Sequence, residues 1–264
     1  MKKFISLALA AMLAAGSLAV GVSAHKDFKS WGDVPATDEK ITLDGKIDEI
    51  YNKGLIIDIA TRTDGVSGGA TGKAYFIWSG SDLYCAIEVK DPEICALDDA
   101  KNAWEQDGIE LTYDWKNDGS TRHKWMVRYD GRVTKAGDAS EDAIKAAATT
   151  ADGSYVIEMV NALPDGVKAG SQIGINVLID DMSGGNATRG IIRSVKSGDA
   201  TENEVAKFDY IVLSADKVAN EAPKAESPKQ DVTQAAQTAD ALSLTAAAAI
   251  IGAAGVILFR KKRG

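Results

Sequence analysis

The sequence predicts an all-β fold, an antiparallel β-sandwich of jelly-roll type. Segments in which apolar and polar residues alternate recur along the chain with turn residues between them, as half-buried strands require. No amphipathic helix of comparable strength separates them, so a sheet built from βαβ units is not expected. The expected strands are KAYFIW (73–78), DLYCAIEV (82–89), GIELTYDW (108–115), KWMVRYD (124–130), SYVIEMV (154–160), QIGINVLID (172–180) and KFDYIVLS (207–214). The alanine-rich DAIKAAATT (142–150) is ambiguous between a helical turn and a strand, and we expect a strand because polar turn residues close it on both sides.

The two ends of the chain predict export and anchoring at the cell surface. Lys2 and Lys3 precede an apolar run that ends in small residues before position 25, a pattern typical of a signal peptide. The uncharged segment 241–259 would be about 28 Å long as a helix, which is sufficient for a membrane span, and the basic residues after it place the main body outside. The expected parts are a signal peptide (1–24), a folded β-sandwich domain (40–214), a Pro/Ala/Gln-rich linker (215–240), a membrane anchor (241–259) and a basic cytoplasmic tail (260–264).

The charge of the chain excludes polyanionic partners. The whole sequence has 30 basic and 38 acidic residues, and without the six basic residues of the signal peptide and tail, 24 basic residues face 38 acidic ones, a net charge of −14. Nucleic acid and anionic lipid need positive charge to neutralise their phosphates, so neither is expected as a ligand.

Cys85 and Cys95 are the only cysteines; the sequence leaves open whether they form a disulfide or stay as two buried thiols.

Odd- and even-numbered residues of a strand point to opposite faces, and this parity predicts a polar surface with an aromatic residue at its edge. Trp104 stands in the polar lead-in to a strand whose odd-numbered residues from 109 to 113 are apolar. The opposite face carries Glu110, and the same parity places Arg128 and Asn176 on that side if their strands are neighbours. An aromatic plane beside hydrogen-bonding groups suits a sugar, whose C–H bonds stack on the ring while its hydroxyls pair with charged and amide groups. We therefore predict a glycan site formed by Trp104, Glu110, Arg128 and Asn176.

Other interpretations of these residues stay open. Glu110 and Arg128 would, as a solvated cross-strand ion pair, contribute only roughly 0.2–1 kcal/mol and no function. A glycoside hydrolase would use Asp107 and Glu110, but both open one strand with no sign of burial and no partner carboxylate. A haem-binding sandwich would use His123 and Met126 as ligands, yet these point to opposite faces of their strand.

The loop from 91 to 107 predicts a structural calcium site. It gathers six carboxylates at irregular spacing, and hard oxygen ligands are those that Ca²⁺ prefers. The candidate ligands are Asp91, Asp98, Asp99 and Asp107. A solvated acidic loop is the alternative, because the spacing is not that of an EF-hand.

Four segments together resemble the successive landmarks of a family 9 carbohydrate-binding module: LDGKIDEIYNKG (43–54), LYCAIEVKDPEI (83–94), NAWEQDGIELTYD (102–114) and IGINVLIDD (173–181). The resemblance implies a non-catalytic β-sandwich that holds the end of a plant-type or other glycan, often a reducing end, between two tryptophans, with structural calcium nearby. Trp104 matches the first tryptophan, and Glu110 matches the carboxylate that accepts sugar hydroxyls.

The sequence departs from this pattern at three positions. The segment SGDATENEVAKFDY (197–210) has no tryptophan where the second one is expected, Met126 stands where the family has an arginine, and Leu178 stands where it has a glutamine. A structural or adhesive surface domain that has lost sugar binding is therefore the main alternative. The tail resembles a degenerate cell-wall sorting signal of a Gram-positive bacterium, with QTAD (237–240) before the apolar segment, so either a sortase cuts after Thr238 or the span stays in the membrane.

Overall fold

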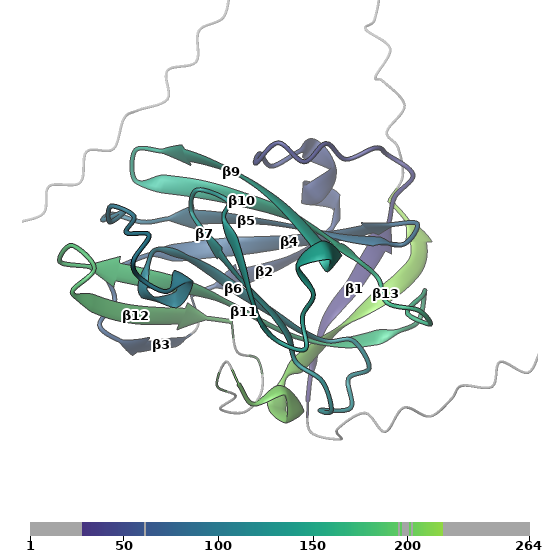
Figure 1. Cartoon of the computed structure of the whole chain (residues 1–264). Coiled ribbons are helices and arrows are strands. Elements are labelled where there is room, and N and C mark those ends of the chain that lie inside the picture. The colour runs from purple at the N-terminus through teal and green to yellow at the C-terminus, as the bar shows by residue number, and fades with distance from the viewer. Residues whose placement is uncertain (1–27, 61, 195, 197–200, 202, 219–264) are drawn as a thin grey trace, which may run out of the picture. The chain divides into compact units, whose positions relative to one another are not determined.

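The structure is a computed structural model that describes residues 28–60, 62–194, 196, 201 and 203–218. Over these residues the chain forms thirteen strands and four short 3₁₀ turns, with no α-helix (Figure 1). The strands are β1 (Ser30–Ala36), β2 (Leu55–Ile59), β3 (Arg62–Gly65), β4 (Thr71–Ser79), β5 (Asp82–Lys90), β6 (Gly108–Asp114), β7 (His123–Arg128), β8 (Val133–Gly137), β9 (Ile144–Ala151), β10 (Ser154–Ala162), β11 (Gln172–Ser183), β12 (Thr188–Arg193) and β13 (Asp209–Lys217). The 3₁₀ turns are η1 (Glu49–Lys53), η2 (Ala103–Glu105), η3 (Glu141–Ala143) and η4 (Val205–Lys207). The predicted all-β class is confirmed.

Every segment expected to be a strand is one, including the ambiguous 142–150, most of which forms β9. The sequence did not reveal five others, which are β1, β2, β3, β8 and β12. Most of these are short or polar, so they carry little of the alternation on which the prediction depends.

One strand corrects the predicted antiparallel sandwich. The hydrogen-bonded order of the main path is β8-β7-β6-β11-β13-β1-β4-β5-β10-β9, so β1 stands between two groups of antiparallel strands. It runs parallel to both of its neighbours, pairing with β13 from Ser30 to Ala36 and with β4 at Trp78. The result is a single mixed sheet rather than two separate antiparallel sheets.

The sheet curves until it nearly closes on itself (Figure 1). The strands at the two ends of the path, β8 and β9, are joined by only residues 138–143, which holds the two edges near each other. Thr150 on β9 donates a hydrogen bond to the carbonyl of Tyr129, just beyond β7. The apolar faces therefore enclose one core, which includes Phe76, Ile87, Trp125, Ile157 and Ile179.

A second, smaller cluster covers the outer face of β4 and β5. There the segment before β2 packs Ile41 and Tyr51 against Tyr75 and Ile77. Glu158 on β10 fixes this segment, because its carboxylate accepts hydrogen bonds from the Tyr51 hydroxyl and from the backbone amides at positions 44 and 45. The landmark segment 43–54 thus has a structural role.

The ends of the chain lie outside the described residues, and so do the predicted signal peptide, most of the linker and the predicted anchor. Within the described part, no helix is both long and apolar enough to span a membrane. Cys85 and Cys95 are both buried and form no disulfide.

Candidate functional site

Trp104 projects from a turn that its neighbours stabilise. It is the central residue of η2, and the Glu105 carboxylate accepts hydrogen bonds from both the backbone amide and the side chain of Asn102, at 3.0 and 2.7 Å. The first of these bonds belongs to a capping box and satisfies a backbone amide that the short turn cannot pair itself, and the second joins the two side chains. The Trp104 side chain remains 39% exposed.

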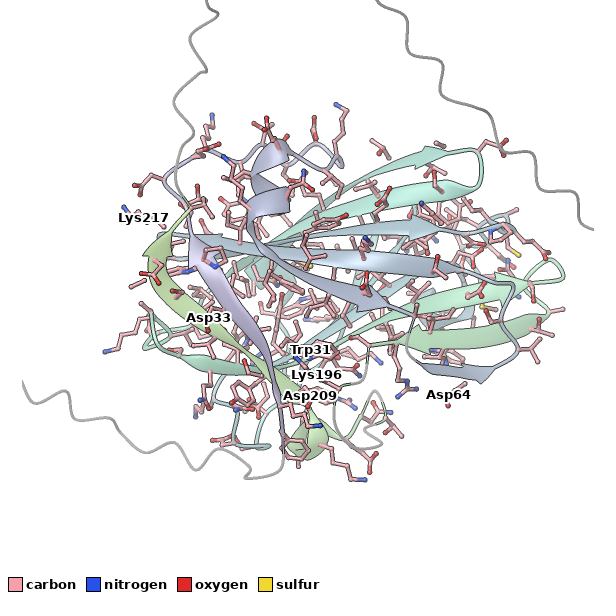
Figure 2. All side chains as sticks on the ribbon, turned by 180° about the vertical axis from the view of Figure 1, so that it is seen from behind. Trp31, Asp33, Asp64, Lys196, Asp209 and Lys217 are labelled. Atoms are coloured by element: carbon pink, nitrogen blue, oxygen red, sulfur yellow. The ribbon has the colours of Figure 1, made fainter. Side chains whose placement is uncertain are left out.

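The other four tryptophans are less available to a ligand. Trp115 and Trp125 are buried in the core. Trp78 is half-buried and donates its indole N–H to the carbonyl of Ser214. Trp31, on β1, is also half-buried, and the Lys196 ammonium lies 5.3 Å from its ring centre (Figure 2). Trp104 therefore offers the most exposed ring.

A pocket of about 220 Å³ adjoins Trp104; we call it the Trp104 pocket. It lies between η2 and the strands β7 and β8. Its lining residues are Lys101, Asn102, Ala103, Trp104, Gln106, Met126, Arg128, Arg132 and Thr134. Two of the four predicted sugar-binding residues, Trp104 and Arg128, thus line one cavity.

The pairing of β6 with β7 and β11 explains why the predicted residues share one face of the sheet. Glu110 on β6 lies opposite Leu178 on β11 and opposite Met126 on β7. Asn176 and Arg128 are each two residues from those partners, so they share the face of Glu110, as parity predicts. The expected neighbourhood of the three strands is confirmed, whereas the role of these side chains in binding sugar stays a prediction.

Glu110 and Arg128 do not pair with each other. Arg128 donates two hydrogen bonds to Asp130, at 2.6 and 3.1 Å, and one to Asp99, at 2.7 Å. Glu110 is 1% exposed and makes an ion pair with Lys124 at 2.5 Å. The suggested cross-strand ion pair is therefore wrong, because each charge has nearer partners.

Arg189 on β12 connects Trp104 to the buried acids. Its guanidinium carbon lies 5.4 Å from the centre of the Trp104 ring, within the range of a cation–π contact. The same guanidinium bonds Asp180 at 2.5 and 3.0 Å and lies 3.4 Å from Glu110. Burial raises the pKa of Asp180 well above its usual value, and the negative charge of Glu110 raises it further, while Arg189 opposes both effects. Arg189 thus covers one face of the ring and neutralises part of the charge beneath it.

Two predicted site residues have limited access to the Trp104 pocket. Neither Glu110 nor Asn176 belongs to its lining, and both are buried. The amide nitrogen of Asn176 has no hydrogen-bond partner among the described residues. Met126 and Leu178, which replace polar residues of the family pattern, lie on the same face, so this part of the surface is more apolar than the resemblance implies.

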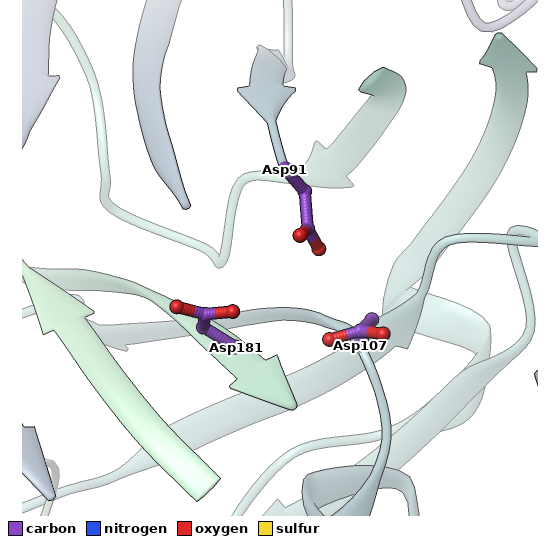
Figure 3. A group of neighbouring side chains, drawn as sticks. All are labelled: Asp91, Asp107 and Asp181. Atoms are coloured by element: carbon purple, nitrogen blue, oxygen red, sulfur yellow. The ribbon is translucent and has the colours of Figure 1, made fainter. Parts of the chain in front are cut away.

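Three buried aspartates converge at another point of the structure (Figure 3). Asp91 follows β5, Asp107 precedes β6 and Asp181 lies in β11, and each offers an oxygen within 4.8 Å of the others. Asp107 accepts hydrogen bonds from the amides of Cys95 and Met182, both at 2.6 Å. We call this group the Asp triad.

The Asp triad could hold a metal ion. One oxygen of Asp91 and one of Asp181 are buried and accept no hydrogen bond from the described residues, which is costly unless a cation or proton is present. Burial raises the pKa of Asp107 to about 7, and the neighbouring charges of Asp91 and Asp181 contribute to the rise. Convergent, water-shielded carboxylate oxygens are hard ligands of the kind that Ca²⁺ selects.

Only two of the four predicted metal ligands belong to this group. Asp99 instead lies on the surface, 77% exposed on its side chain, and bonds Arg128 and Arg132. Asp98 bonds the backbone amide of Ala100 in its own loop. The sequence missed Asp181, although a second aspartate at the end of the apolar run INVLIDD was a signal that could have revealed it.

The carboxylates considered for hydrolysis are buried, contrary to the expectation that they are exposed. Asp107 is 0% exposed and Glu110 is 1% exposed. Both are engaged, Asp107 by two backbone amides and the Asp triad, and Glu110 by Lys124 and Arg189. Neither lines the Trp104 pocket.

Comparison with known protein families now identifies the domain. The family described as "Carbohydrate family 9 binding domain-like" matches residues 43–238. The chain belongs to this family. The predicted resemblance is confirmed.

Relatives and solved structures agree with the family 9 assignment. Endo-1,4-beta-xylanase C of Paenibacillus barcinonensis is 29% identical over 154 residues, which are 56% of this chain and 14% of that protein. Endo-1,4-beta-xylanase A of Thermoanaerobacterium saccharolyticum is 29% identical over 121 residues, or 44% of this chain and 10% of that protein. The chain thus spans only a small part of each xylanase.

The fold matches family 9 modules of known structure. A carbohydrate-binding module of family 9 from Caldicellulosiruptor kristjanssonii in complex with cellotriose has a TM-score of 0.60 and 18% identity, covering 72% of this chain and 100% of that one. A family 9 module from the same organism in complex with glucose also gives a TM-score of 0.60, at 17% identity and the same coverage. A putative carbohydrate-binding protein from Bacteroides uniformis gives 0.51 at 14% identity, covering 70% of this chain and 99% of that one. At these identities the likeness shows the shared fold.

Proposed function

We propose that this domain is a non-catalytic module that binds the end of a glycan chain, with one sugar ring stacked on Trp104. The observation that carries the proposal is the exposed Trp104 ring at the edge of a pocket lined by polar and charged side chains. Membership of family 9, and the cellotriose and glucose complexes of a module with the same fold, support a glucose-containing ligand. The small volume of the pocket suits one terminal ring better than the middle of a polysaccharide.

The engagement of the buried acids supports binding rather than hydrolysis. A glycosidase needs two carboxylates facing each other across the scissile bond, one of them an acid with a raised pKa. Asp107 and Glu110 are held by backbone amides and by ion pairs and do not line the pocket. The Asp triad would bind a structural Ca²⁺ that fixes the end of β5, the start of β6 and β11 relative to one another.

We also propose that the module lies at the cell surface. The signal peptide and the apolar, basic-ended tail support an extracellular domain held at the surface of a Gram-positive cell, either in the membrane or on the wall. The linker would let the module reach polysaccharide outside the cell.

The test is calorimetric titration with cellotriose. Trp104→Ala should weaken binding by roughly 1–3 kcal/mol, because the stacking plane and its contact area are lost. Ile56→Ala on β2 is a matched control, because it also removes an exposed apolar side chain, 43% exposed, from a strand outside the pocket. If the wild-type domain binds no oligosaccharide at millimolar concentration, or binds equally well after Trp104→Ala, the proposal is wrong. A structural or adhesive domain would then be favoured.

A further inference from the structure

The Trp104 pocket has an unusual charge for an acidic protein. Three cationic residues line it, Lys101, Arg128 and Arg132, and no Asp or Glu of the described part of the chain does. The chain as a whole has 38 acidic and 30 basic residues, so a general attraction for anions is excluded and the positive charge is a local property.

The nearby carboxylates bind these cations without lining the pocket. Asp130 and Asp99 both bond Arg128, and Asp99 also bonds Arg132 at 2.9 Å. Because Asp99 is shared by two guanidinium groups and is 77% exposed on its side chain, solvent weakens its hold on either one. Glu105 is engaged by Asn102.

Two of the three cations keep unused donors. Within the described part of the chain, Arg132 donates from its side chain only through one terminal nitrogen, to Asp99, which leaves Nε and the second terminal nitrogen. Lys101 donates to the backbone carbonyl of Asn186 and makes no ion pair with a described residue. Both side chains line the same cavity as Trp104, so an anionic group on a sugar stacked there would find charged donors beside it.

We propose that the Trp104 pocket prefers a sugar ring that carries an anionic group, a uronate carboxylate or a sulfate, over the neutral sugar. This inference rests on the proposed function and specifies its ligand. The ring stacks on Trp104, and the anionic group accepts hydrogen bonds from Arg132 and Lys101. A guanidinium fork matches a carboxylate or a sulfate in two-point geometry, whereas a neutral hydroxyl uses only one of its donors.

The experiment compares glucose, glucuronate and glucose 6-sulfate by calorimetry on the same protein. Glucuronate should bind about tenfold more tightly than glucose at low salt, and the difference should shrink at 0.5 M NaCl, because partly exposed charges are screened. The sulfate arm shows whether the pocket distinguishes the two anionic groups. Equal or weaker binding of both anionic sugars relative to glucose would overturn the inference while leaving the proposed function intact.

Charge variants identify the residues responsible. The double change Lys101→Gln and Arg132→Gln should reduce the preference for glucuronate to about twofold, because the unused donors are lost at nearly constant size. Arg132 is 58% exposed on its side chain, so this change should not disturb folding. Lys145→Gln on β9 removes one positive charge from an exposed lysine outside the pocket, and it should keep the full preference. A preference that survives the double change, or that falls equally in the Lys145 control, contradicts the assignment. If neither glucose nor any anionic sugar binds, the proposed function itself fails.

Discussion

Four charged side chains near Trp104 show how single residues determine the site. Glu110 and Asp180 are both buried, and Lys124 and Arg189 neutralise them. Arg189 also lies over the Trp104 ring, so it links the stability of this group to the position of the aromatic plane. Removing one partner from such a group leaves an uncompensated buried charge, which costs far more than the loss of a surface ion pair.

Arg189→Leu should therefore lower the free energy of unfolding by about 3 kcal/mol, since two buried carboxylates would share only Lys124. Adding Asp180→Asn should restore part of the loss, because the buried carboxyl group that needs either a counter-charge or a proton is then gone. Urea denaturation of the wild type, both single variants and the double variant measures the coupling. Additive effects would mean that Arg189 and Asp180 do not interact.

The surroundings of individual side chains were the least predictable feature of the site. Parity correctly placed Glu110 and Arg128 on one face, because strand geometry repeats every two residues. It could not reveal that Glu110 is covered by Lys124 and Arg189, since burial depends on elements far away in sequence. Glu110→Gln is consequently a poor probe of sugar binding, because it would also leave Lys124 without its counter-charge.

At the scale of elements, the Asp triad connects three separate segments of the chain. Asp91 directly follows β5, Asp107 directly precedes β6 and Asp181 lies in β11, while the loop before β4 donates backbone amides at positions 69 and 70 to Asp181. A cation here would stabilise the relative positions of four segments. Without it, burial and the neighbouring carboxylates raise the pKa of Asp91 and Asp107 and so oppose their ionised state.

Calcium should accordingly raise the melting temperature relative to chelator. At a concentration about 100-fold above Kd the gain is about 2.7 kcal/mol, or roughly 5–10 °C for a domain of this size. Because burial raises the pKa of Asp107 to about 7, the folded state retains a proton that the unfolded chain loses near pH 4. In chelator, this group's contribution to stability is therefore present at low pH and lost as the pH rises through 7.

The same pKa predicts competition between protons and calcium. The apparent calcium affinity should fall as the pH is lowered from 8 to 5.5, since Asp107 must release its proton to bind the ion. Asp98→Asn is the control, because Asp98 lies outside the Asp triad and should leave the calcium effect intact. A melting temperature that is the same with calcium and with chelator at pH 8 would show that the triad holds no calcium.

Strand β1 and its parallel pairing could not be predicted from the sequence. Its residues SWGDVPA have no alternating pattern, so nothing marked them as a strand. Yet β1 joins the two antiparallel groups by parallel pairing, which only the positions of β13 and β4 dictate. The alternating strands on either side were predictable because each has one face in the core.

At the scale of the whole molecule, the function of a non-catalytic binding module depends on where the module is held. The apolar segment 241–259 and its basic end predict an anchor, and deletion of residues 241–264 should release the protein into the medium. Immunoblotting of medium and membrane fractions measures this. Retention of the truncated protein in the membrane fraction would contradict the anchor, and mass spectrometry of the mature C-terminus separates cleavage after Thr238 from a retained span.

The account as a whole depends on Trp104 as the sugar platform, and the indole N–H signals in ¹H–¹⁵N NMR spectra test that directly. The chain has five tryptophans, so each spectrum contains its own four controls. Titration with cellotriose or glucuronate should shift the Trp104 signal with a saturable dependence on sugar concentration, while the signals of the core residues Trp115 and Trp125 stay in place. If the Trp104 signal does not move at millimolar sugar, or if Trp31 or Trp78 responds in its place, the proposed site is wrong.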